Sequence, residues 1–151
     1  MSQIENKTEV VSALNKILKG EHMAIELYND FIEEIDTTEI KDLLQKFQQE
    51  HREHTNILST RIQNLDGIPS ESSGLSGLMA NTMMEIGNLL GIKPKNKEII
   101  EKIYNGEQKG LKKVEEIQHE KLDQESRDIV DKIIATDHNH LKKIEELLNI
   151  E

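Results

Sequence analysis

Apolar residues recur at intervals of three and four along most of the chain, which is the spacing that one face of an α-helix requires. In the first such stretch Leu14, Ile17, Leu18, Ile25 and Tyr28 follow this rule. The pattern predicts four helices, at about residues 8–35, 38–65, 97–121 and 125–149.

The connections between these helices differ in length and composition. Asp36 and Thr37 form a short capping-type turn between the first two helices, and Gly67 and Pro69 end the second. Residues 66–96 are rich in Gly, Ser and Pro and form a long crossover, whose apolar residues suggest one short amphipathic helix. One long crossover between two short turns predicts two antiparallel helix pairs, with the second and third helices parallel.

Composition agrees with an all-α fold, a four-helix bundle in a single domain that spans residues 1–151. A length of 151 residues is typical of one domain. The chain has 3% aromatic residues, eight glycines and two prolines, which is sparse for a sheet protein with many tight turns.

Charge and cysteine content exclude several classes of function. The net charge of −10 and the pI of about 5.1 argue against nucleic-acid binding, which depends on neutralising phosphates with Lys and Arg. The absence of Cys rules out disulfides and thiolate metal sites, so any metal must be held mainly by His, Asp or Glu. Without a signal peptide or a run of about eighteen apolar residues, we expect no membrane association and a cytoplasmic location.

An offset of 86 residues aligns the two halves of the chain and predicts an internal duplication. It places Glu21 on Glu107, His51 on Asp137 and His54 on His140, and it also matches apolar positions and Gly20 with Gly106. Apolar matches alone are weak, because any two amphipathic helices can be slid into phase. The polar matches therefore indicate two related half-sites.

These polar residues lie in or beside the apolar stripes, with Glu21 and Glu107 at the stripe centres. An ionisable side chain inside a core is costly unless it is paired or bound to a metal. Residues three apart share a helix face, so His51 with His54, and Asp137 with His140, can each reach one ion. A buried network of His and carboxylate groups is the competing interpretation. The candidate metal ligands are Glu21, Glu50, His51, His54, Glu107, Asp137 and His140.

The remaining histidines, His22, His119 and His138, lie off the stripes, and we assign them no metal role. Tyr28 and Tyr104 lie on the core stripe near the two glutamates. Core filling is the favoured interpretation for both tyrosines over a redox or ligand-supporting role.

The chain resembles the ferritin-like superfamily, which includes bacterioferritins, rubrerythrins and uncharacterised bacterial families, over roughly residues 8–150. The resemblance rests on Gly20-Glu21, on Glu50-His51-Arg52-Glu53-His54, on Gly106-Glu107 and on Asp137-His138-Asn139-His140. The crossover and the segment that begins at Gly106 look like those of an uncharacterised bacterial ferritin-like family.

The resemblance implies two metal ions held by a Glu from each of the first and third helices and a Glu-x-x-His pair from each of the others. Glu21, His54, Glu107 and His140 match this pattern. His51 and Asp137 depart from it, and a neutral imidazole cannot bridge two metals as a carboxylate does. Asp137 would then be the bridge, and Glu50 is the alternative helix-two ligand. Two iron ions are the first expectation, with zinc or manganese as alternatives.

Three hypotheses for the function follow. The first is a metal-binding protein with a di-iron centre that reacts with oxygen or peroxide, as an oxidase or ferroxidase. The second is a non-catalytic bundle that binds a protein partner, and the third is a single zinc ion that only stabilises the fold. Exposed Met and Leu residues of the crossover would favour a homodimer through this segment.

Overall fold

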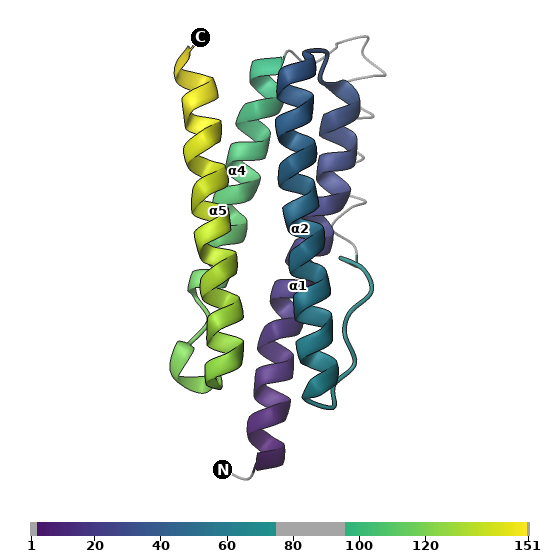
Figure 1. Ribbon diagram of the computed structural model, residues 1–151, viewed down its shortest axis with the longest axis vertical. Coiled ribbons are helices and arrows are strands. Elements are labelled where there is room, and N and C mark those ends of the chain that lie inside the picture. Colours follow the sequence, from purple (N-terminus) through teal and green to yellow (C-terminus); the bar gives the residue numbers. More distant parts are fainter. Residues whose placement is uncertain (1–2, 75–95, 151) are drawn as a thin grey trace.

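A bundle of four long α-helices forms the part of the chain that the computed structural model describes, residues 3–74 and 96–150 (Figure 1). The helices are α1 (Gln3–Glu34), α2 (Thr38–Asn64), α4 (Asn96–Glu115) and α5 (Gln124–Ile150), with a short 3-10 turn, η1 (His119–Lys121), before α5. The predicted crossover helix, and dimerisation through it, lie outside the described residues.

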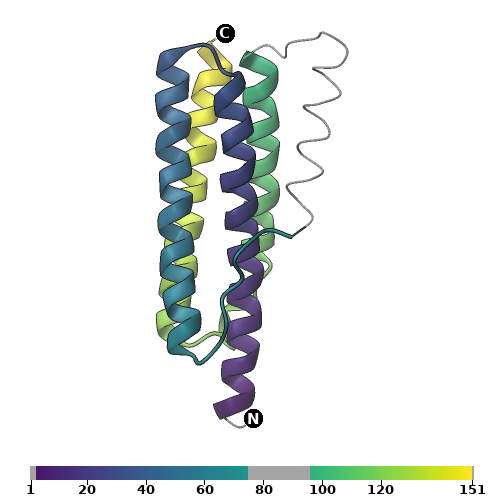
Figure 2. The same ribbon diagram turned by 90° about the vertical axis from the view of Figure 1, so that its right-hand side faces the viewer.

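The two helices within each half of the chain run in opposite directions. Helices α1 and α2 form one antiparallel pair and α4 and α5 form the other, while α2 and α4 run in the same direction (Figures 1 and 2). The all-α four-helix bundle with two antiparallel pairs and a long crossover is therefore confirmed.

The third helix ends earlier than its apolar pattern predicts. It was expected to reach residue 121, but α4 ends at Glu115 and the backbone at Gln118 is extended. The 3-10 turn that follows places Leu122 in the core, where it is 4% exposed. The apolar pattern therefore extends past the end of α4, because Ile117 and Leu122, which follow the helix, also pack on the core.

The apolar core consists of two clusters at different heights along the bundle. One, on the side of the polar residues that faces the N-terminus of α1, is formed by Val10, Leu14, Ile17, Leu18, Leu58, Ile62, Val114, Leu122, Val130 and Ile133. The other lies toward the opposite end and is formed by Tyr28, Phe31, Ile35, Leu44, Phe47, Ile99, Ile100, Ile103 and Ile144. Between the two clusters lie buried ionisable side chains from all four helices.

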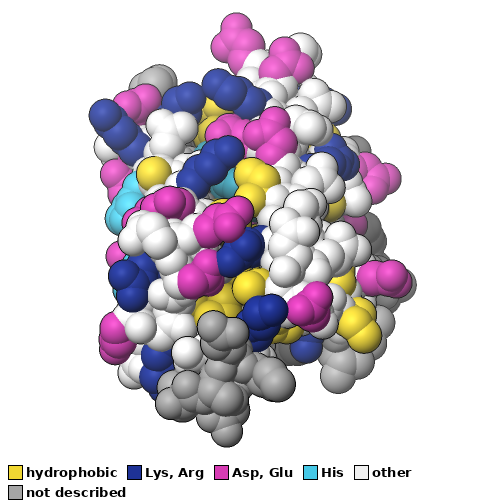
Figure 3. Space-filling view, turned by 60° about the horizontal axis from the view of Figure 1, so that its bottom comes forward, with side chains coloured by type: hydrophobic (Ala, Val, Ile, Leu, Met, Phe, Trp, Pro, Cys, Tyr) yellow, Lys and Arg dark blue, Asp and Glu magenta, His cyan; other side chains and the backbone are white. Residues whose placement is uncertain are grey.

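Polar contacts join the helix pairs at both ends of the bundle. Arg61 of α2 pairs with Glu125, in the first turn of α5, at 2.7 Å and with Asp123, which directly precedes α5. At the other end, the Asn96 amide donates to Asp36 Oδ1 at 2.8 Å. The end view in Figure 3 shows Lys and Arg side chains interspersed with Asp and Glu. None of the described helices is long and apolar enough to cross a membrane.

Candidate metal centre

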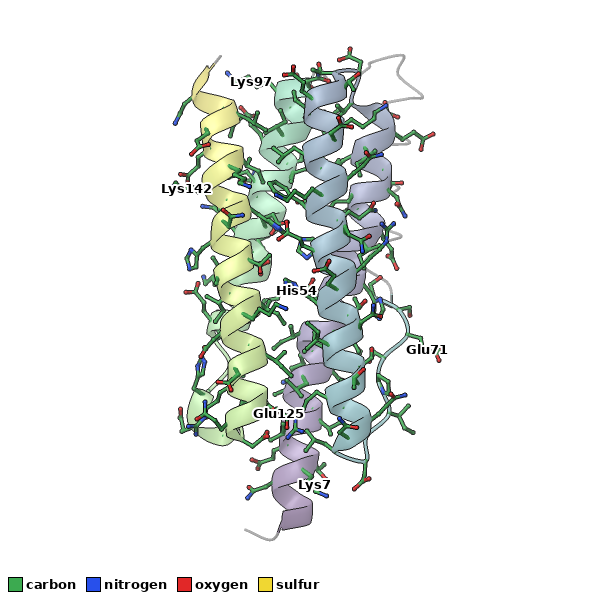
Figure 4. All side chains as sticks on the ribbon, viewed as in Figure 1. Lys7, His54, Glu71, Lys97, Glu125 and Lys142 are labelled. Carbon is green, nitrogen blue, oxygen red and sulfur yellow. The ribbon has the colours of Figure 1, made fainter. Side chains whose placement is uncertain are left out.

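Six ionisable side chains form a polar layer between the two apolar clusters. They are Glu21 from α1, His51 and His54 from α2, Glu107 from α4, and Asp137 and His140 from α5. None is more than 7% exposed, and Figure 4 shows His54 at mid-height in the bundle. The structure therefore brings six of the seven predicted ligands into one cluster.

His51 lies between the two glutamates and presents one ring nitrogen to each. Its Nδ1 is 2.6 Å from Glu21 Oε2, and its Nε2 is 2.8 Å from Glu107 Oε1. The imidazole thus connects α1 with α4 through hydrogen-bonding contacts on both sides.

Each of the two other histidines lies beside one of the glutamates. His54 Nδ1 is 3.3 Å from Glu21 Oε1, and His140 Nδ1 is 3.4 Å from Glu107 Oε1. His140 Nε2 points the other way, toward Glu50 Oε1 at 3.5 Å. Glu50 is thus close to His140 and is the most exposed of the predicted ligands, with its side chain 27% exposed.

Several buried polar atoms at the layer have no hydrogen-bond partner among the described residues. They are Asp137 Oδ1, both ring nitrogens of His140 and Glu50 Oε1. Buried polar atoms are normally paired, because leaving one unpaired costs about 1–3 kcal/mol. Unpaired carboxylate and imidazole atoms beside one another are the donor set that a divalent metal ion uses, so these residues fit a metal.

The donor atoms form two overlapping groups of four, and within each group all four atoms lie within 4.8 Å of one another. We call Glu21, His51, His54 and Asp137 half-site A, and His51, Glu107, Asp137 and His140 half-site B. His51 and Asp137 belong to both, whereas Glu50 belongs to neither.

Burial and mutual charge set the protonation of the layer without a metal. Burial alone would raise the pKa of Glu21 and of Glu107. The pKa of Glu21 is nevertheless lowered by His51 and His54, and that of Glu107 by His51 and His140. Burial would lower the pKa of His51, but the Glu107 and Glu21 carboxylates raise it well above its usual value. Burial, reinforced by the charges of Glu107 and Glu21, raises the pKa of Asp137 to about 8. At neutral pH these shifts favour the charged form of His51 between two carboxylates and the protonated form of Asp137.

Two aromatic side chains contact the predicted ligands directly. The Tyr28 hydroxyl donates to Glu107 Oε1 at 2.6 Å, and its ring lies 5.5 Å from that of His51. The Phe47 ring stacks on His140 with centroids 4.1 Å apart. Tyr28 fills the core, as its sequence position favours, and also donates to a predicted ligand, whereas the Tyr104 hydroxyl donates to Glu145 outside the layer. Phe47 lies four residues before His51 on the buried face of α2, and this spacing is the signal that could have identified it as a neighbour of the site.

The three histidines that were given no metal role have partners elsewhere. His22 Nε2 is 2.9 Å from the carbonyl oxygen of Ser70, and His119 Nε2 is 2.7 Å from Asp131 Oδ1. His138 is 59% exposed in its side chain. None of them belongs to a half-site.

A groove of about 1050 Å³ between α1 and α4 extends from the surface of the described part to the polar layer. Its lining includes Glu21, His51, Glu107 and Asp137, but neither His54 nor His140. Outside the layer, its charged lining residues are Lys16, Lys102, Lys109, Lys112, Lys113 and Lys121, with Glu9 and Glu116.

Comparison with known proteins agrees with this architecture. A family model described as "Domain of unknown function (DUF2383)" matches residues 9–120. A search of curated proteins gives no match.

Two solved structures share the fold. A ferritin-like, diiron-carboxylate protein from Bacillus anthracis str. Ames is 20% identical, with a TM-score of 0.72 over 98% of this chain and 99% of that one. A dodecameric thioferritin from Bacteroides fragilis, described as related to bacterioferritin, is 15% identical, with a TM-score of 0.74 over 95% and 86% of the two chains. These similarities show that the fold is ferritin-like.

Proposed function

The chain belongs to the family described as domain of unknown function DUF2383, and we propose that it is a metal-binding protein whose polar layer holds iron. The observation that carries this proposal is the set of unpaired buried atoms, Asp137 Oδ1 and both nitrogens of His140. A metal ion would compensate their desolvation in one step, because it binds carboxylate oxygen and imidazole nitrogen together.

The two half-sites give the layer room for as many as two ions, which is the nuclearity that the ferritin-like resemblance implies. The Bacillus anthracis neighbour is described as a diiron-carboxylate protein, and this description supports iron as the first choice. Three carboxylates, from Glu21, Glu107 and Asp137, carry less charge than two divalent ions. Glu50 is close enough to His140 to supply a fourth negative charge nearby.

Bound iron would supply one-electron chemistry toward oxygen or peroxide, and the chain supplies the surroundings. The two apolar clusters exclude water above and below the layer. Tyr28 holds Glu107 in position through its 2.6 Å hydrogen bond. The groove provides a route for a small molecule to the carboxylate side of the layer. We therefore propose oxidase or ferroxidase activity as the use of the iron.

Metal content after expression with added iron, and separately with added zinc, tests the proposal. We expect bound metal in the wild-type protein and less metal in a Glu107→Ala, His140→Ala variant, because half-site B loses two of its four donors. A His119→Ala, His138→Ala variant is the matched control, since both side chains lie outside the half-sites. Equal, near-zero metal in the wild-type protein and in the first variant would contradict the proposal.

The oxidase activity needs a second measurement. After anaerobic loading with Fe²⁺ and exposure to air, we expect the near-ultraviolet absorption of ferric iron to appear in the wild-type protein. No spectral change, together with bound zinc and a lower melting temperature after chelation, would favour the stabilising zinc ion instead. Absence of any metal would leave the non-catalytic bundle.

A further inference from the structure

We infer that the polar layer binds one metal ion tightly, in half-site B, and a second ion in half-site A only much more weakly, because both half-sites need His51. This inference deepens the proposed function and depends on it. In this arrangement Glu21 accepts a hydrogen bond from the ligand His51 and does not bind the first ion itself.

The argument starts from the lone pairs of an imidazole. A neutral imidazole carries a lone pair on one ring nitrogen and a hydrogen on the other, so it can give only one nitrogen to a metal. The two nitrogens of His51 face different half-sites, with Nδ1 at 2.6 Å from Glu21 and Nε2 at 2.8 Å from Glu107. An ion that takes one nitrogen leaves the N–H on the side of the other half-site.

The unpaired atoms favour half-site B as the first to be filled. Both ring nitrogens of His140 are buried without a partner, and His140 belongs to half-site B only, whereas Asp137 is shared. In half-site A, by contrast, each oxygen of Glu21 is already paired, one with His51 and the other with His54. Either ion has to replace a contact of His51, but only half-site B also contains a histidine, His140, whose ring nitrogens are both unpaired.

Charge favours one bound ion over two, but it does not choose between the half-sites, because each contains two carboxylates and two histidines. Half-site B contains two carboxylates, Glu107 and Asp137, and two histidines that can be neutral ligands. One divalent ion makes this group formally neutral, which suits a site whose residues are no more than 7% exposed. A second divalent ion would add two positive charges with only Glu21 left to compensate them inside the layer.

The surrounding carboxylates match the arrangement that metal-bound histidines usually have. A ligating histidine normally donates its other N–H to a carboxylate, which fixes the ring and strengthens the ligand. With Nε2 on the ion, His51 would donate Nδ1–H to Glu21 Oε2. His140 presents Nδ1 to Glu107 and has Glu50 Oε1 at 3.5 Å from Nε2, so Glu50 would do the same for His140.

Titration calorimetry with Zn²⁺, and anaerobically with Fe²⁺, tests the inference, with the metal-to-protein ratio measured afterwards. We expect one tight ion per chain and a second that binds about 100-fold more weakly, a coupling of the usual size between linked sites. His51→Glu supplies two oxygens in place of one available nitrogen, so it should bring the second affinity close to the first.

Two pairs of matched variants identify the half-site that is filled first. Glu107→Gln and His140→Ala should abolish the tight ion, because they remove ligands of half-site B. Glu21→Gln and His54→Ala should keep it, with about a 10–100-fold loss for Glu21→Gln, the usual effect of removing a supporting carboxylate. Far-ultraviolet circular dichroism would confirm that each variant is helical, and these pairs decide the question even if the His51→Glu chain does not fold.

The outcomes separate the inference from the function on which it depends. No ion bound to the wild-type protein would overturn the proposed function. Two ions of similar affinity in the wild-type protein, or equal losses in Glu21→Gln and Glu107→Gln, would overturn only the inference.

Discussion

Asp137 lies in an environment very different from that of a carboxylic acid in water. It is 3% exposed, its Oδ1 has no hydrogen-bond partner, and burial together with the charges of Glu107 and Glu21 raises its pKa to about 8. The folded metal-free protein therefore binds a proton at Asp137 at pH values where the unfolded chain has released it. Stability that depends on this proton is lost as the pH rises toward 8.

After metal removal with a chelator, we expect the free energy of unfolding to fall between pH 5 and pH 8. Asp137 contributes to this fall, and so does His51, whose raised pKa stabilises the fold most below about 6.5. The lowered pKa values of Glu21 and Glu107 act below this window. Asp137→Asn cannot ionise, so it should flatten the dependence and be more stable than the wild-type protein at pH 8, by at least about 1 kcal/mol.

Urea unfolding at pH 5, 6.5 and 8 measures this effect. Asp42→Asn is the control, because Asp42 is exposed on α2. If the Asp137→Asn and wild-type proteins show the same pH dependence, the proton is not held at Asp137.

At the scale of the helices, the sequence predicted which face of each helix points into the core better than it predicted where each helix ends. Apolar spacing identified all four helices in the described part, because each packs one stripe into the bundle. It did not find the end of α4 at Glu115, since Leu122 in the following turn also packs into the core. Gly67 was expected to end α2, but α2 ends at Asn64, and in the turn that follows the residue with positive φ is Asp66 (63°) rather than Gly67. Gly67 instead lets the chain pass close to Val11.

Two glycines should respond in opposite ways to the same substitution. Gly106 lies inside α4, where an added Cβ meets nothing within 4 Å, so Gly106→Ala should stabilise the fold by about 0.5–1 kcal/mol. At Gly67 the added Cβ would lie 2.7 and 2.8 Å from the methyl groups of Val11. Gly67→Ala should therefore destabilise the fold by about 1–3 kcal/mol.

Chemical denaturation of the metal-free proteins compares the two glycine variants directly. A loss of stability in Gly106→Ala would show that the space beside this helix is occupied. An unchanged midpoint in Gly67→Ala would show that Val11 can move aside at little cost.

For the molecule as a whole, the sequence predicted the architecture and the composition of the polar layer, but not its internal geometry. Helix periodicity placed Glu21, Glu107 and the α2 and α5 pairs on inward faces. The position of His51 between the two glutamates depends on how the helices are rotated and spaced, which a pattern along one chain does not contain. The same holds for Tyr28 on Glu107 and for Glu50 behind His140.

Binding of an ion to side chains from several helices should stabilise the entire bundle. A free metal concentration 100-fold above the dissociation constant contributes about 2.7 kcal/mol to folding. For a domain of this size this corresponds to a rise in melting temperature of roughly 5–10 °C. Calorimetry before and after chelation measures the shift, and Glu107→Gln should show little of it. An equal rise in both proteins would place the ion elsewhere.

The groove between α1 and α4 has a consequence for the speed of metal uptake. The protein carries a net charge of −10, yet the groove lining outside the polar layer contains six lysines and two glutamates. These lysines are exposed, whereas the carboxylates of the polar layer are buried, so a cation that entered by this route would meet the positive charges first. For the proposed metal, these lysines would slow association while the ligands would set the equilibrium affinity, so an ion bound tightly would still be taken up slowly.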